Sequence, residues 1–89
     1  MIRIMTPGGD THSGQTARQV IEDMHERAIF LADQSTDEYL IGLRDRGKEF
    51  YGVSLGLEGD TLDERCESML ASILKHGLAV TIPEEEDAT

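Results

Sequence analysis

The only cysteine of the chain, Cys66, and one of its three histidines, His76, share the stretch GDTLDERCESMLASILKHGLAV (residues 59–80). A cysteine in contact with a histidine can act as an activated nucleophile. In a helix, however, ten residues correspond to a rise of about 15 Å, which is too far for that contact. Cys66 falls in the apolar stripe of the predicted helix, where a thiol behaves as a small unreactive apolar group. We therefore expect Cys66 to be structural and His76 to favour the helix C-terminus.

Glu22 and His25 are a second pair whose spacing suggests chemistry. Carboxylate-bridged metal centres place Glu and His three residues apart on a helix, but they need two such pairs. The chain has one Glu-x-x-His sequence and no second. We expect no metal site, and we expect His25 to be an ordinary surface or boundary histidine.

Two glycine-containing turns, TPGGD (6–10) and GLEGD (56–60), match no phosphate-binding loop pattern and contain no lysine or arginine. Ser35 precedes the second predicted helix, near the place of the cofactor-bearing serine in acyl and peptidyl carrier proteins. It follows Gln34 and lacks the Asp-Ser-Leu-like motif of those proteins. Ser35 is better interpreted as a helix N-cap, and no cofactor is expected.

The histidines leave one catalytic alternative open, a site assembled from distant residues such as His12, His25 and acidic groups. Such a site would leave no local motif in the sequence. Because no convergent catalytic motif is present, we expect that the protein is not an enzyme.

Three segments have one apolar face at helical spacing, namely residues 16–32, 35–52 and 61–76. Each begins with Ser or Thr followed three residues later by Glu or Gln, which predicts a capping box. In the second helix, Leu40, Leu43, Gly47 and Phe50 form the predicted apolar face, with Tyr39 and Tyr51 at its edges. Glycines at positions 52 and 77 are expected to end the second and third helices.

Three short segments alternate apolar and polar residues, as strands do: 1–5, 53–57 and 78–82. Residues 11–14, which follow the turn TPGGD, are the candidate for a further short strand that completes a hairpin with the first. In residues 78–82, Leu78, Val80 and Ile82 are predicted to share the buried face. The order favours an α+β fold, a two-layer domain with three amphipathic helices on one face of a three- to four-stranded sheet. We expect residues 1–82 to form this single domain and residues 83–89 to be a disordered acidic tail.

The net charge is −10, large for 89 residues. Such a charge repels nucleic acid and anionic lipid, so no direct nucleic-acid binding is expected. No apolar stretch approaches the roughly 20 residues of a membrane-spanning helix, and MIRIMTPGGD does not have the pattern of a signal peptide. A single cysteine suits a reducing compartment. These features predict a cytoplasmic protein that does not bind membranes.

Two apolar residues, Phe30 and Ile41, lie off the apolar faces of their predicted helices. Arg44 and Lys48 share the side of Ile41 and are the clustered basic residues of an acidic chain. These four residues form the candidate interaction surface, unless the apolar pair packs together or is singly exposed. The resulting hypothesis is a non-catalytic interaction module that binds another protein or forms a homodimer. The alternative is an acidic regulatory inhibitor or nucleic-acid mimic that binds a basic protein.

Overall fold

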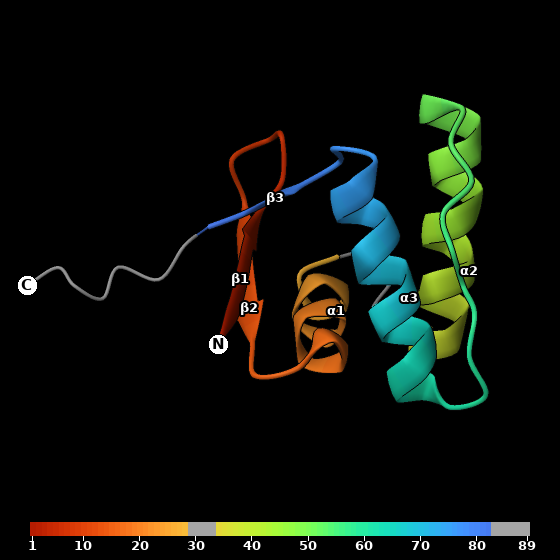
Figure 1. Cartoon of the computed structure of the whole chain (residues 1–89), viewed down its shortest axis with the longest axis horizontal. Helices are drawn as coiled ribbons and strands as arrows, with labels where there is room; N and C mark the ends of the chain where they lie inside the picture. Colours follow the sequence, from red (N-terminus) through yellow and green to blue (C-terminus); the bar gives the residue numbers. More distant parts are fainter. Residues whose placement is uncertain (29–33, 83–89) are drawn as a thin grey trace, which may run out of the picture.

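The computed structural model describes residues 1–28 and 34–82. Its elements, in chain order, are β1 (Ile2–Met5), β2 (Thr11–Gly14), α1 (Ala17–Glu26), α2 (Thr36–Arg46), the π-helical turn η2 (Gly47–Tyr51), α3 (Leu62–Lys75) and β3 (Val80–Thr81). The strands form an antiparallel sheet in the order β2-β1-β3. All the helices lie on one side of this sheet (Figure 1). The predicted α+β class is confirmed, with three strands.

The register of the sheet decides which side chains face the helices. Ile4 pairs with His12 on β2 and with Thr81 on β3, and its side chain is fully buried. Side chains alternate along a strand, and directly paired residues share a face. Met5 and its partner Val80 therefore point to the outer face of the sheet, which no described helix covers (Figure 1).

The third helix ends as predicted. Gly77 adopts a left-handed conformation with φ of 74°. The amide of Leu78 donates to the carbonyl of Ile73 at 3.0 Å, and the amide of Gly77 donates to that of Leu74 at 3.1 Å. These two bonds define a Schellman motif, which satisfies carbonyls at the end of the helix.

The face predicted for the last strand is wrong. β3 contains only Val80 and Thr81, and Val80 is 54% exposed while Ala79 is 3% exposed. The Schellman motif packs Leu78 against the core immediately before the strand begins. This turn sets the alternation one residue out of phase with the prediction, so that Ala79 faces the core.

The core lies between the sheet, α1 and α3, and α2 closes it from the far side (Figure 1). Its buried apolar members are Ile4, Ala17, Val20, Ile21, Tyr39, Leu40, Leu55, Cys66, Met69, Leu70, Ile73 and Ala79.

Helix α1 ends at Glu26, with Arg27 as its C-cap, and is therefore shorter than the predicted helix over residues 16–32. None of the helices within residues 1–28 and 34–82 has the length and apolar character needed to cross a bilayer.

The predicted strand over residues 53–57 is wrong, because this segment has no regular secondary structure. Its amides donate to serines of α3 instead: Gly56 to the hydroxyl of Ser72 at 2.8 Å, and Glu58 to that of Ser68 at 3.1 Å. A Cβ atom on residue 56 would lie 2.8 Å from both hydroxyls. Helix hydroxyls thus accept hydrogen bonds that a neighbouring strand would otherwise accept, and glycine permits the close approach.

The caps of the three helices agree largely with the sequence. Ser35 and Thr61 form complete capping boxes with Glu38 and Glu64, respectively. Thr16 caps α1, but the side chain of Gln19 accepts from the amide of residue 15 rather than from that of Thr16. The start of each helix was therefore predictable from residues within one turn.

Candidate interaction surfaces

The residues with potential for chemistry occupy structural positions. Cys66 is fully buried among apolar neighbours, and this burial raises the pKa of its thiol from 9.0 to about 11. The neutral thiol is a poor nucleophile, so the prediction of an unreactive cysteine agrees with its surroundings. His76 is the exposed C-cap of α3.

The prediction that His25 is a surface or boundary residue is wrong. Its exposure is 9%, and its ring stacks on that of Tyr39 with centroids 4.6 Å apart. The guanidinium carbon of Arg46 lies 5.9 Å from the centroid of the same tyrosine ring. Tyr39, predicted at the edge of the apolar face of its helix, is instead 4% exposed, because α2 packs its aromatic ring against α1. Glu22 pairs with Arg18 at 3.1 Å.

His12, the remaining histidine, links the β-hairpin to α1. Nδ1 of His12 lies 3.1 Å from Oδ2 of Asp23. Arg27 lies 3.7 Å from the other oxygen of the same carboxylate and donates to the carbonyl of Thr11 at 2.9 Å. Because His12 is 7% exposed, this network satisfies a buried polar group and fixes β2 on the helix. Within residues 1–28 and 34–82, no three His, Cys, Asp or Glu residues are grouped so as to hold a metal ion.

The interaction surface predicted from the sequence is only partly described. Phe30 lies outside the described residues. Ile41 is 43% exposed, and Arg44 and Lys48 are exposed on the same helix. The two basic residues line a shallow hollow of about 340 Å³ with Ser54 and others. The role of this surface stays a prediction.

A second surface, which the sequence did not indicate, lies at the end of α2. Phe50 is 67% exposed and Tyr51 is 60% exposed. Both border a hollow of about 260 Å³ between this end of the helix, the β1–β2 turn and the connection from α3 to β3. Its lining is mainly apolar and includes Pro7, Met24, Leu43, Leu55, Ile73, Leu78 and Ala79. We call this feature the aromatic hollow.

The position of Phe50 explains why its ring is uncovered. It follows Leu43 by seven residues, about two helical turns, and both side chains border the aromatic hollow. Figure 1 shows that the C-terminal end of α2 and η2 extends beyond the end of α3. The predicted apolar face of this helix therefore points in the correct direction, but it extends beyond the end of α3, which covers the rest of it. Gly52, with φ of 68°, ends the helix immediately afterwards.

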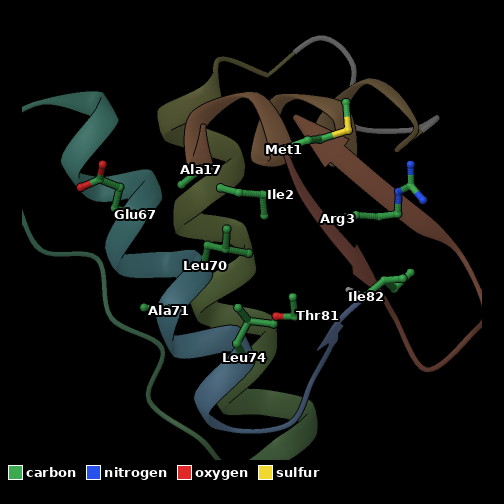
Figure 2. Close-up of a pocket in the computed structure, with 10 residues that line it drawn as sticks. All are labelled: Met1, Ile2, Arg3, Ala17, Glu67, Leu70, Ala71, Leu74, Thr81 and Ile82. Atoms are coloured by element: carbon green, nitrogen blue, oxygen red, sulfur yellow. The ribbon is translucent and has the colours of Figure 1, made fainter. Parts of the chain in front are cut away.

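A third hollow, of about 510 Å³, lies between the inner face of the sheet and α3 (Figure 2). Ile2, Leu70, Leu74 and Thr81 point into it, whereas Arg3 and Ile82 point to the other side of the sheet (Figure 2). Glu67 stands at its rim on α3. We call this feature the sheet–helix hollow.

Comparison with protein-family models, with curated proteins and with solved structures gave no significant match in any of the three.

Proposed function

We propose that the protein is a non-catalytic interaction module that associates with a second copy of itself through the aromatic hollow. The observation that supports this proposal is the pair of exposed aromatic side chains, Phe50 and Tyr51, beside an apolar hollow. Aromatic residues supply a large share of binding energy in protein interfaces when they fill pockets on a partner. In a two-fold arrangement, the aromatic rings of each copy enter the hollow of the other.

The local charge favours a second copy at this place. The chain as a whole carries a net charge of −10, which opposes self-association over most of its surface. Along residues 44–49, however, Arg44, Arg46 and Lys48 alternate with two acidic residues, Asp45 and Glu49. The end of α2 is thus close to neutral, and two copies can approach there with little electrostatic repulsion.

The test is the solution mass of the full chain over a wide range of concentration, measured by light scattering after size exclusion. The wild type is expected to form a dimer whose population rises with concentration. The double variant Phe50→Ser/Tyr51→Ser is expected to stay monomeric. Circular dichroism and denaturant unfolding of the variant check that its fold is retained.

Ile41→Ser is the matched control, because it removes an exposed apolar side chain from the predicted surface on the same helix. It should leave the dimer intact. If Ile41→Ser abolishes the dimer and the double variant does not, the surface predicted from the sequence is the contact. A wild-type chain that stays monomeric at every concentration would contradict self-association.

A further inference from the structure

We infer that the aromatic hollow also binds an apolar carboxylate of the size of a medium-chain fatty acid, and that this ligand displaces the second copy. The displacement rests on the proposed function, because it requires the dimer contact to lie in the same hollow. The binding itself does not. Self-association would then depend on the concentration of a small ligand.

The charge of the hollow favours an anion. Among the described residues that line it, Arg46 is the only charged one and none is acidic. No carboxylate within residues 1–28 and 34–82 pairs with Arg46. Four other arginines each form an ion pair with a carboxylate: Arg18, Arg27, Arg44 and Arg65. A ligand carboxylate can pair with the guanidinium of Arg46 through two parallel hydrogen bonds.

The guanidinium of Arg46 is held in place by its own helix. Its carbon lies 5.9 Å from the centroid of the buried Tyr39 ring. A Cβ atom on residue 42 would lie 3.2 Å from Nη1 of Arg46, so the side chain runs back along α2 over Gly42. Contact through the face of a guanidinium leaves the N–H groups at its edge able to donate. Pairing with a ligand therefore costs little additional side-chain freedom.

The rest of the hollow fits one narrow apolar group. Between the levels of Gly42 and Phe50 the helix rises about 12 Å. Leu43 and Gly47 line the hollow over this length. Its volume of about 260 Å³ lies between the roughly 150 Å³ of a cavity that holds benzene and the roughly 300–1,000 Å³ of drug-sized sites. An alkyl chain suits such a space, with its carboxylate at Arg46 and its other end against Phe50.

The ligand and the second copy compete for the same space. In the proposed dimer, the aromatic rings of each copy enter the hollow of the other. A hollow of about 260 Å³ does not hold an alkyl chain and an aromatic ring together, because packed protein surfaces leave no spare volume. Ligand bound to the monomer therefore lowers the population of the dimer by mass action.

The probe is octanoate, kept below its micelle concentration and titrated by calorimetry into the full chain at the lowest usable protein concentration. Octylamine and 1-octanol are the comparison ligands, because they carry the same alkyl chain with a positive and a neutral end. Octanoate should bind most tightly and octylamine least, since only the carboxylate pairs with Arg46. Equal binding of the three would overturn the charge argument.

Two pairs of variants locate the site. Arg46→Gln should weaken octanoate binding at least about tenfold, as expected for a lost charge-assisted hydrogen bond, and leave octanol binding unchanged. Arg44→Gln makes the same change in charge outside this hollow and is its control. Pro7→Trp fills the hollow from an exposed position and should weaken both ligands. Gly8→Trp is its control, because a Cβ atom there has no neighbour within 4 Å.

Circular dichroism checks the fold of each variant, and Pro7→Trp keeps the test decisive if Arg46→Gln unfolds. Unchanged octanoate affinity in both Arg46→Gln and Pro7→Trp would overturn the binding site.

Light scattering separates this inference from the proposed function. Excess octanoate should convert the wild-type dimer to monomer, and should fail to do so in Arg46→Gln. A wild-type dimer that persists in saturating octanoate would overturn the displacement. A chain that is monomeric at every concentration, yet binds octanoate through Arg46, would contradict the proposed dimer and the displacement with it while supporting the carboxylate site.

Discussion

Helices α2 and α3 have the same sequence pattern but differ in how much of their apolar stripe is covered by other elements. Each begins with a complete capping box and carries one apolar stripe. Along α3, Cys66 and Met69 are fully buried and Ile73 is 5% exposed. Along α2 and η2, Leu40 is fully buried but Phe50 is 67% exposed. An apolar stripe thus predicts the direction a helix faces, but not whether another element lies opposite.

The arrangement of layers explains the difference. α3 lies between the sheet side of the molecule and α2, so its apolar side chains have neighbours in both directions (Figure 1). α2 is the outermost helix, and its last turns extend past α3 (Figure 1). The apolar side chains at that end are therefore exposed, which is why the proposed dimer contact is placed there.

The largest expected effect on stability comes from a substitution in the covered apolar stripe of α3. Met69→Ala removes a fully buried side chain and leaves a cavity, which should lower the free energy of unfolding by about 2–5 kcal/mol. Denaturant unfolding with far-ultraviolet circular dichroism measures it, beside Leu43→Ala on the partly covered stripe of α2. A larger loss for Leu43→Ala would contradict the difference between the two helices.

The second-largest expected effect is a pH dependence of stability, caused by Cys66 in the same apolar stripe of α3. Burial raises the pKa of the Cys66 thiol from 9.0 to about 11. Above pH 9 the unfolded chain loses this proton while the native chain keeps it, so stability falls as pH rises from about 9 to 11. The expected loss is on the order of 2 kcal/mol. Unfolding curves at a series of pH values measure it.

Cys66→Ala is the control for that prediction, because it should flatten this part of the pH profile. Burial also raises the pKa of Tyr39, which adds a loss in the same direction at higher pH. An unchanged slope in Cys66→Ala would show that the thiol is not the group responsible.

A smaller effect on stability is expected where serines of α3 accept hydrogen bonds from the irregular segment that follows η2. Ser72→Ala removes the acceptor of the Gly56 amide and should cost about 1 kcal/mol of stability. Hydrogen exchange of that amide should accelerate as well. Ser68→Ala is the comparison, because its partner, the amide of Glu58, is exposed and can bond to water. Equal losses in both variants would contradict this account.

The smallest effect on stability is expected at the uncovered stripe. Phe50→Ser should change the free energy of unfolding of the monomer by no more than about 0.5 kcal/mol, because exposed positions contribute little. Unfolding at a concentration below that of any dimer measures this value. A loss comparable to that of Met69→Ala would show that the ring is buried in solution and would remove the basis of the proposed contact.

The sequence predicted well wherever a feature depends on neighbouring residues. The capping boxes of α2 and α3 and the left-handed Gly77 need only side chains within one or two turns. Cys66 lies on the apolar face of α3, as its place in the predicted stripe indicated. These features were correct because their physical cause is local.

The prediction failed where the cause is a contact between distant segments. Residues 53–57 have strand-like alternation, yet Ser68 and Ser72 accept hydrogen bonds from this segment. His25 of α1 is buried because the ring of Tyr39, in α2, stacks on it. The aromatic hollow was missed for the same reason, since its lining residues are far apart in the chain, from Thr6 to Ala79.

The sequence by itself determined the α+β class, the limits of most helices and the acidic character of the chain. Short-range sterics, capping and alternation are fixed by residues close together in the chain. Only the tertiary structure decided which apolar faces are covered, since burial depends on the element that packs opposite. The hollow beneath Phe50 and the hollow beside Leu70 exist because a three-stranded sheet and three helices leave these faces without a neighbour among the described residues.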